Sequence, residues 1–413
     1  MAESFFSEFN KRNYFNQCTN FEELEKLINK KKIRAYIGFD CTSKSLHVGS
    51  LLQIMCLRLL QKYGHQPIVL LGGGTTRIGD PSGKEETRKI LSGREIDDNI
   101  KNIEKILKIF LKEKNNSTKP IFVNNYDWLE KLKYIDFLRK IGKHFTINKM
   151  LSFDSVKLRL DREHSLSYME FNYMILQAYD FLELNKQKKC ILQIGGSDQW
   201  GNIVNGVELI KRHNNSQAYG LTTPLITLAS GNKMGKTERG AVWLDKNLLS
   251  PYDYWQFWRN VDDKDVIKFL QMFTDLQLDK IQDLQNNKVD INQLKILLAN
   301  QTTKMLHGES AAKNAEQTAK NTFEKKSIGS DLPIVNIKKE IAKKGVNIID
   351  LVILSKLSTS KSEVRRIIKN RGIRLNNEIV ENEKEKILIS DFNKDKHAKL
   401  SHGKKKHVII KII

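Results

Sequence analysis

The sequence predicts an α/β protein with a doubly wound, Rossmann-like parallel sheet, followed by a helical domain and a small α+β domain. In the first half of the chain, apolar strands alternate with amphipathic helices, which is typical of parallel sheets. Three of the expected strands end in glycines. Near Pro251 the alternation stops, and a helical pattern rich in Leu, Lys and Gln replaces it.

Each strand of the expected sheet is a short apolar run. We expect strands at 35–40, 67–74, 119–128 and 188–196, and helices at 51–63, 96–114 and 168–184. The glycine-rich strand ends are Gly38–Asp40, Gly72–Gly74 and Gly195–Asp198. Because ligands bind at the carboxyl ends of the strands in such sheets, these three ends predict one composite pocket.

The second half of the chain shows no strand pattern until its end. Residues 251–323 are helical in pattern, 324–336 have the composition of a linker, and β-like runs occupy 373–380 and 405–413. We expect a Rossmann-like catalytic domain over 1–247, a helical domain over 248–325, a linker over 326–346 and a third domain over 347–413.

The net charge of the 413-residue chain is +22. Residues 331–413 hold 20 Lys and Arg against 10 Asp and Glu, so +10 falls in these 83 residues and +12 in the other 330. An AT-rich genome, which favours Lys, Asn and Ile, would explain a uniform excess. Because the charge is concentrated near the C-terminus, we expect that part to bind RNA or DNA.

Cysteine usage and hydropathy indicate a cytoplasmic protein. The four cysteines are scattered, with no C-x-x-C pair and no His at zinc-finger spacing, so we expect a reduced protein without a structural metal. No apolar run approaches the roughly 20 residues that span a bilayer, and the N-terminus lacks the apolar core of a signal peptide. We therefore expect no association with a membrane.

Two lysine-bearing loops are candidates for binding phosphate. The segment GNKMGKTE holds Lys233 and Lys236 in a loop that contains two glycines. This pattern favours a mobile loop whose lysines bind phosphates. The alternative is a solvated surface loop. Residues 75–88 read TTRIGDPSGKEETR. This segment fails as a P-loop, because Ile78 and Glu85 stand where Gly and Ser or Thr are required.

Two further segments carry ligand-binding side chains. His47 precedes Val48 and Gly49 at the expected entrance of a helix, where the N–H groups favour anions. The alternative is a histidine that caps or packs. Asp198 and Gln199 follow the last strand, where an Asp commonly bonds to a ribose; a simple turn is the alternative.

The expected helix at 168–184 carries a polar stripe. On a wheel of 100° per residue, Tyr173, Gln177 and Asp180 share an arc about 60° wide, fenced on both sides by apolar residues. Buried polar groups need partners, and a polar ligand can supply them. A solvated patch or an internal hydrogen-bond network is the alternative.

Together these motifs resemble those of bacterial-type tyrosyl-tRNA synthetases, which are class I enzymes. The resemblance covers nearly the whole chain and is carried by GFD…SLHVGS, GDPSGK, NNYDW, GKHF, YMILQAYDF, LQIGGSDQWGN, KMGKT and SPYDYWQFW. It implies that ATP activates L-tyrosine to tyrosyl-adenylate and that the tyrosyl group then moves to the 3′ end of tRNA(Tyr). ATP would bring Mg²⁺ as part of the co-substrate, with no tightly bound cofactor. A homodimer would form through an insertion at about 126–165.

The resemblance also implies a role for individual residues. Those expected around tyrosine are Tyr36 and Asp180 at the phenol, Asp80, Tyr173 and Gln177 at the ammonium, and Asp40, Asn125 and Gln199 near the carboxylate. Those expected around ATP are Gly38, Gly49, Ser50, Gly195, Gly196 and Asp198. Those expected to act in catalysis at the pyrophosphate are Thr42, His47, Lys84, Arg88, Lys233, Lys236 and Thr237.

A basic helix near the C-terminus is expected to contact the tRNA. Ser360 and Glu363 have the spacing of a capping box at its start. The side chains that project from it are Lys361, Arg365, Arg366 and Lys369. The segment resembles a small RNA-binding fold shared with a ribosomal protein, and a charged, solvated helix is the alternative.

The chain departs from the family at three positions. Ser50 stands where the first class I motif usually ends in His or Asn, Gly235 makes the second motif KMGKT rather than KMSKS, and Ile37 replaces a polar residue of some members. Two rivals share the scaffold: tryptophanyl-tRNA synthetase and a catalytically idle RNA-binding protein. The pair Tyr36 and Asp180 favours tyrosine, and the loop lysines favour an active enzyme.

Overall fold

The computed structural model describes residues 4–81, 91–111, 117–162, 166–229, 231, 234–237, 240–324, 332–393, 396–403 and 406–413. The chain folds into two compact units, one of residues 1–249 with 257–306 and one of residues 250–256 with 307–413. The expected domain boundaries near 247, 325 and 346 stay predictions. Among the described residues, no helix has the length and apolar character needed to cross a membrane.

The first unit is built on a six-stranded sheet with the order β1-β6-β5-β2-β3-β4. Its strands are β1 (Gln17–Cys18), β2 (Arg34–Asp40), β3 (Gln66–Gly72), β4 (Ile121–Asn124), β5 (Leu192–Gly196) and β6 (Tyr219–Thr223). All neighbours are parallel except the edge strand β1, which is antiparallel to β6. The predicted parallel sheet is confirmed, and its topological switch point lies between β2 and β5.

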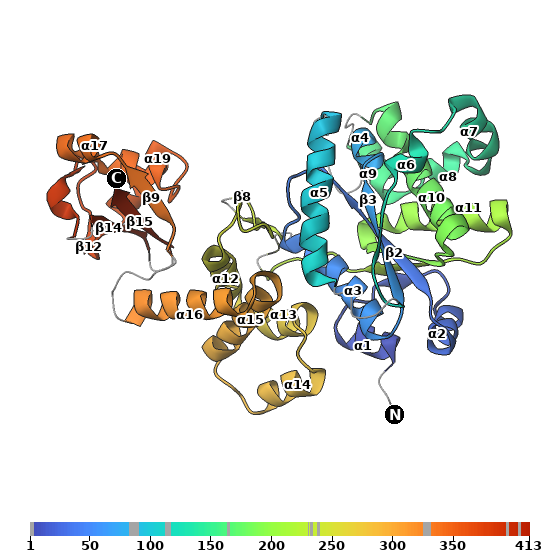
Figure 1. The fold of residues 1–413 in the computed structure, drawn as a ribbon, viewed down its shortest axis with the longest axis horizontal. Coiled ribbons are helices and arrows are strands. Elements are labelled where there is room, and N and C mark those ends of the chain that lie inside the picture. The colour runs from blue at the N-terminus through green and yellow to red at the C-terminus, as the bar shows by residue number, and fades with distance from the viewer. Residues whose placement is uncertain are drawn as a thin grey trace. The chain divides into compact units, whose positions relative to one another are not determined.

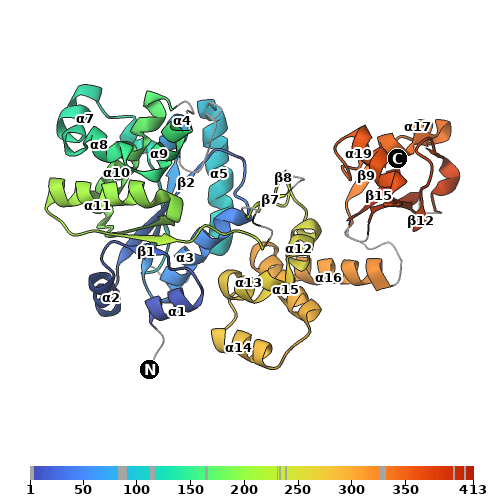
Figure 2. The ribbon, with the colours of Figure 1, turned by 180° about the vertical axis from the view of Figure 1, so that it is seen from behind.

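Helices cover both faces of this sheet (Figures 1 and 2). On one side lie α3 (Leu51–Lys62) and α5 (Gly93–Phe110), and on the other lie α10 (Tyr168–Lys188) and α11 (Trp200–Asn214). Helix α10 begins at a capping box, in which Ser167 and Glu170 bond to each other's backbone N–H. A buried ion pair of 3.0 Å between Arg159 and Glu170 ties the start of α10 to the preceding helix.

The remaining elements of the first unit are shorter. Its other helices are α1 (Phe5–Lys11), α2 (Phe21–Lys30), α4 (Thr75–Ile78), α6 (Tyr126–Leu129), α7 (Tyr134–Lys140), α8 (Ile147–Leu151), α9 (Asp154–Asp161), α13 (Val266–Phe273) and α14 (Leu278–Asn286). A two-stranded sheet joins β7 (Lys236–Thr237) to β8 (Gly240–Ala241). The division between the units falls within α12 (Pro251–Arg259) and at the end of α15 (Ile291–His307).

The second unit contains α16 (Glu309–Glu324) and the predicted α+β fold. Its main sheet has the order β12-β11-β14-β15-β9, and only β15 and β9 pair in parallel. The strands are β9 (Ile334–Ile337), β10 (Val346–Asn347), β11 (Ile373–Leu375), β12 (Glu378–Ile379), β13 (Lys386–Ile387), β14 (His397–His402) and β15 (Lys406–Ile412). The helices are α17 (Lys339–Lys344), α18 (Ile348–Leu354) and α19 (Lys361–Lys369). Apolar residues from the helices and strands form one core.

The predicted capping box of α19 is wrong in one half. The Ser360 side chain accepts a hydrogen bond from the Glu363 N–H at 3.2 Å, as expected. The Glu363 carboxylate instead accepts from the Ser358 hydroxyl and from the Thr359 N–H at 3.3 Å. Because these neighbours compete for the carboxylate, it does not close the reciprocal bond to the backbone of Ser360.

Candidate functional site

A cavity of about 190 Å³ lies at the switch point of the six-stranded sheet, between the carboxyl ends of β2 and β5. Strands β2 and β5, helix α10 and two turns supply its walls. The residues predicted from the sequence that line it are Tyr36, Gly38, Asp40, Asp80, Tyr173, Gln177, Asp180, Gly195, Gly196 and Gln199. The cavity is therefore lined by two of the three predicted glycine-rich strand ends, those at Gly38–Asp40 and Gly195–Gly196, whereas no residue of Gly72–Gly74 lines it.

The deepest charged group in the cavity is Asp180, which is 1% exposed. Its Oδ1 accepts a hydrogen bond from Trp128 Nε1 at 2.8 Å, and its Oδ2 accepts one from Asn125 Nδ2 at 2.9 Å. Burial raises the pKa of this carboxyl to about 7, although the two hydrogen bonds lower it. The carboxyl is therefore held by neutral donors rather than by a cation, and it titrates near neutral pH.

Two further polar atoms, from residues that line the cavity with Asp180, have no hydrogen-bond partner among the described residues. They are Tyr36 Oη and Gln193 Oε1, and both are buried. Tyr36 on β2 and Gln193 on β5 are paired in register, so both side chains leave the same face of the sheet. Burial and the nearby Asp180 charge raise the pKa of Tyr36. Because buried polar groups are rarely left unpaired, this end of the cavity is suited to a polar ligand atom.

A chain of hydrogen bonds links this end to Asp40. Asn125 Nδ2 also donates to Thr75 Oγ1 at 3.0 Å, and Thr75 Oγ1 donates to Asp40 Oδ1 at 2.8 Å. The other oxygen of Asp40 accepts from Tyr173 Oη at 3.0 Å. Gly72 is required beside this chain, because an added Cβ would stand 2.4 Å from Asp40 Oδ1.

Amide side chains organise the opposite wall. Gln199 Nε2 donates to Asp80 Oδ2 at 2.9 Å. Asn202 Nδ2 donates to the Oε1 atoms of both Gln177 and Gln199, each at 3.1 Å. Asn202 thus holds both glutamines, and Gln199 in turn bonds to the Asp80 carboxylate.

The expected ATP-binding turn lies at the start of α3. His47 Nδ1 accepts a hydrogen bond from the Gly49 N–H at 3.0 Å, and His47 forms a β-bridge with Trp243. A Cβ added to Gly235 would stand 2.6 Å from His47 Nδ1, so the KMGKT segment passes close to this histidine. The two class I motifs therefore meet within the first unit.

Not every predicted site residue lines the cavity. Those that lie outside its lining are Thr42, His47, Gly49, Ser50, Asn125 and Asp198. Asn125 is fully buried behind the cavity, where it supports Asp180. Lys84, Arg88 and Lys233 lie outside the described residues, as do the side chains of Lys236 and Thr237.

Sequence reasoning missed four residues that shape the site, namely Thr75, Trp128, Gln193 and Asn202. Trp128 and Asn202 lie within the quoted blocks NNYDW and LQIGGSDQWGN, which carried the resemblance but assigned them no role. Gln193 interrupts an apolar strand, and this polar residue in a buried run was the available signal. Thr75 gave no separate signal.

The basic side chains predicted on α19 are all exposed. Lys361 pairs with Asp350 at 2.8 Å, and Arg365 lies 3.8 Å from Glu383. Exposed pairs of this kind stabilise a fold by only about 0–1 kcal/mol, so they are easily exchanged for other anions.

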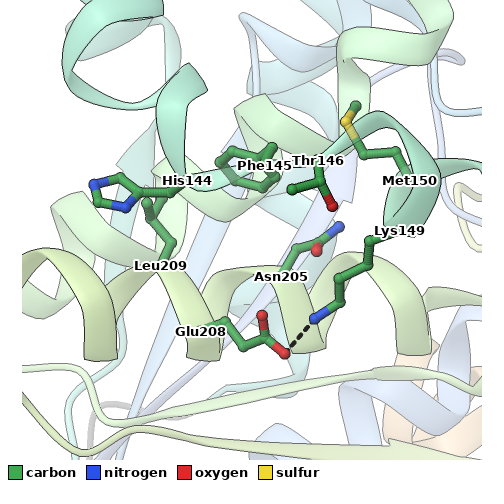
Figure 3. A pocket seen from close by; sticks show the side chains of 8 residues that line it. All are labelled: His144, Phe145, Thr146, Lys149, Met150, Asn205, Glu208 and Leu209. Atoms are coloured by element: carbon green, nitrogen blue, oxygen red, sulfur yellow. Dashed lines mark hydrogen bonds and ion pairs between the residues drawn. The ribbon is translucent and has the colours of Figure 1, made fainter.

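A second hollow in the first unit, of about 10 Å³, lies against α11 (Figure 3). Its lining includes Thr146, Asn205 and an ion pair between Lys149 and Glu208. A space of this size holds about one water molecule, so it is not a substrate site.

Family models match both parts of the chain. A model described as "tRNA synthetases class I (W and Y)" matches residues 28–324, and one described as "Tyrosine--tRNA ligase SYY-like C-terminal domain" matches residues 324–410. The chain is 66% identical over 409 residues to a tyrosine–tRNA ligase of Pelagibacter ubique, covering 99% of both proteins. It is 48% identical to the tyrosine–tRNA ligase of Rickettsia bellii, covering 99% of this chain and 100% of that protein.

Solved structures of class I synthetases have a similar fold over most of this chain. A C-terminally truncated mitochondrial tyrosyl-tRNA synthetase of Coccidioides posadasii matches with a TM-score of 0.67 and 33% identity, covering 76% of this chain and 91% of that one. A tryptophanyl-tRNA synthetase of Plasmodium falciparum matches with a TM-score of 0.55 and 14% identity over 74% of this chain and 84% of that one, which is a likeness of fold alone.

Proposed function

The chain belongs to the tyrosine–tRNA ligases among the class I tRNA synthetases, and we propose that the cavity between β2 and β5 is where it activates tyrosine. The activity is that of a tyrosine–tRNA ligase, with ATP as co-substrate. The observation that carries the proposal is the deep end of the cavity. There burial, together with the buried Asp180 carboxyl close by, raises the pKa of Tyr36, whose Oη has no hydrogen-bond partner in the described part of the chain. The tryptophan rival is set aside by the whole-chain relatives.

The phenol of tyrosine fits this deep end chemically. Its O–H would donate to Asp180, and its oxygen would accept from Tyr36 Oη. Both protein groups would then be satisfied by one hydroxyl. Phenylalanine would leave them buried and unpaired, which costs about 1–3 kcal/mol for each group. This family is a standard example of discrimination by such unpaired groups, without editing.

The opposite wall fits the amino-acid head group. Asp80, Tyr173 and Gln177 offer oxygen acceptors for the substrate ammonium. Its carboxylate would lie toward Asp40 and Gln199, facing the start of α3. With the phenol held at the other end, the carboxylate oxygen is directed toward the ATP phosphates.

The first step would then proceed by positioning. A tyrosine carboxylate oxygen attacks the α-phosphorus of ATP, the bond from that phosphorus to the pyrophosphate breaks, and tyrosyl-adenylate forms. The carboxylate is already ionised, so no general base is needed. Charge growing on the pyrophosphate would be stabilised by His47 and by the lysines of KMGKT. In the second step a hydroxyl of the 3′-terminal ribose of tRNA(Tyr) attacks the tyrosyl carbonyl, the bond from that carbonyl to the phosphate breaks, and AMP leaves.

Mg²⁺ would arrive with ATP. Magnesium sites commonly combine substrate phosphates with one or two carboxylates, and the described residues hold no cluster of three or more His, Cys, Asp or Glu suited to a metal. Asp40, expected beside the reacting carboxylate, is the candidate carboxylate for this ion. The ion would neutralise phosphate charge, while the protein holds the reacting atoms.

We also propose that the protein acts in the cytoplasm as a homodimer, through α7, α8, α9 and the start of α10. These elements expose large apolar side chains, which are Tyr134, Ile135, Leu138, Ile147, Leu151, Leu160 and Tyr168. A concentration of apolar side chains on a surface marks an interaction site. The surface coincides with the insertion expected at 126–165, and a second copy of the chain is its proposed partner.

Ile135→Asp should therefore weaken the dimer. The new carboxylate would be desolvated in the interface, so at micromolar concentration light scattering should give a mass close to one chain. Leu354→Asp, at an exposed position on α18, is the control and should leave the mass unchanged. A wild-type protein that is monomeric, or an Ile135→Asp protein that keeps the wild-type mass, would contradict the proposed interface.

Selectivity for tyrosine should depend on Asp180 and on pH. Because the pKa of this carboxyl is raised to about 7, it loses its proton as pH rises through neutrality and becomes the better acceptor for the phenol. In amino-acid-dependent ATP–pyrophosphate exchange, the ratio of kcat/KM for tyrosine to that for phenylalanine should rise between about pH 6 and pH 8. Asp180→Asn should lower this ratio by at least about tenfold and remove its rise with pH.

Thermal unfolding of Asp180→Asn is the control for this prediction. The substitution should change the melting temperature only slightly while it lowers the selectivity ratio. If Asp180→Asn unfolds readily while its folded fraction discriminates like the wild type, the polar stripe of α10 is structural. If the wild-type chain shows no tyrosine-dependent exchange, the proposed use of the cavity fails entirely.

The C-terminal domain should bind tRNA through the basic side chains of α19. A chain that ends at Glu324 should keep tyrosine-dependent exchange, because all residues assigned to adenylate formation precede that position, but should lose most tRNA charging. Binding of tRNA by the full chain should weaken steeply with salt, since counterions are released from the phosphates. Equal charging by both chains would exclude this domain as the tRNA-binding module.

A further inference from the structure

Asn202 lies outside the substrate cavity yet controls two residues that line it. It occupies the first turn of α11 and is 4% exposed. Its Nδ2 donates to Oε1 of Gln177 on α10 and to Oε1 of Gln199 in the turn after β5, at 3.1 Å each. One buried amide therefore joins two walls of the cavity.

These two bonds decide which way each glutamine amide faces. The two ends of an amide have almost the same shape but opposite hydrogen-bonding character, so neighbouring groups determine the orientation. With its oxygen held by Asn202, Gln199 turns its Nε2 toward Asp80 and donates at 2.9 Å. If the amide were reversed, its oxygen would face the Asp80 carboxylate. Two acceptor oxygens cannot form a hydrogen bond, so this orientation is unfavourable.

We propose that Asn202 is a positioning residue for tyrosine binding. Its NH₂ group orients Gln177 directly and, through Gln199, fixes the Asp80 carboxylate. Gln177 Oε1 keeps a second lone pair for the substrate ammonium. The inference rests on the proposed function, because it takes Asp80 and Gln177 as the ammonium-binding groups.

The same helix supplies a matched control. Asn205 lies three residues further along α11 and is also 4% exposed. Its Nδ2 has no hydrogen-bond partner among the described residues. It borders the small hollow against α11 shown in Figure 3 and not the substrate cavity. Truncation at 202 or at 205 thus removes the same atoms from equally buried positions, but only one truncation breaks bonds to the cavity.

The test is steady-state ATP–pyrophosphate exchange on the full chain. Asn202→Ala should raise KM for tyrosine by at least about tenfold, with kcat and KM for ATP within about threefold of the wild type. Asn205→Ala should leave KM for tyrosine within about twofold. Asn202→Asp keeps the shape but offers acceptors to both glutamine oxygens, so its KM should rise at least as far as that of Asn202→Ala.

Asn202→Asp removes the NH₂ donor but keeps the shape of the side chain, so it separates the loss of the hydrogen bonds from a loss of packing. A wild-type KM for tyrosine in both Asn202→Asp and Asn202→Ala would overturn the proposal, as would an equal rise in Asn205→Ala. Circular dichroism checks that each variant is folded. If the Ala and Asp variants unfold, Asn202→Ser retains one donor and should give an intermediate KM; a wild-type KM there would also overturn the proposal.

Variants of the cavity itself distinguish this inference from the proposed function. Gln177→Ala and Asp80→Asn should each raise KM for tyrosine if the ammonium binds there. If they do and the Asn202 variants do not, only the role of Asn202 is wrong. If all of them leave KM unchanged, the assignment of the cavity fails.

Discussion

The site depends on a carboxyl group that is buried without a cation. Asp180 is 1% exposed, and its two oxygens are held by the neutral donors Trp128 Nε1 and Asn125 Nδ2. An ionised carboxylate in such surroundings is costly, which is why burial raises its pKa to about 7. A ligand that donates one more neutral hydrogen bond relieves this cost and a ligand without a donor does not. A ligand whose hydroxyl donates to this buried acceptor should therefore bind more tightly than the same ligand without the hydroxyl.

The strand order brings the parts of this site together. Because β2 and β5 are neighbours at the switch point, Tyr36 and Gln193 leave the same face toward α10. The chain of hydrogen bonds through Asn125 and Thr75 then reaches from Asp180 to Asp40. The groups for the phenol and the group beside the expected carboxylate are therefore parts of one rigid network, which holds both ends of a small substrate at a fixed separation.

Much of this arrangement could be predicted from the sequence. Alternating strands and helices gave the parallel sheet, and the 3.6-residue period placed Tyr173, Gln177 and Asp180 on one stripe of α10, where all three line the cavity. Periodicity is local, so it could not show that Asn125 would bond to Asp180 across 55 residues, or that Trp128 and Asn202 would join the network. Those contacts follow from tertiary packing. Residues 126–128, expected to end a strand, begin helix α6, and helices α7, α8 and α9 were missed. Helices of four to eight residues are too short for a 3.6-residue period to be recognised. The half-formed cap of α19 depended on competition from Ser358.

Proton release on binding tests the central claim most directly. The heat of tyrosine binding, measured at about pH 6.5 in buffers of different ionisation enthalpy, reports the number of protons exchanged on binding. The free amino acid's own groups titrate away from that pH. If the phenol donates to Asp180, binding favours the ionised carboxyl, which is the stronger acceptor, and lowers its pKa from about 7. A fraction of a proton should then be released for each tyrosine bound. The release should be absent for phenylalanine and for Asp180→Asn. Tyrosine binding to the wild-type enzyme without proton release, or an equal release by Asp180→Asn, would contradict the account.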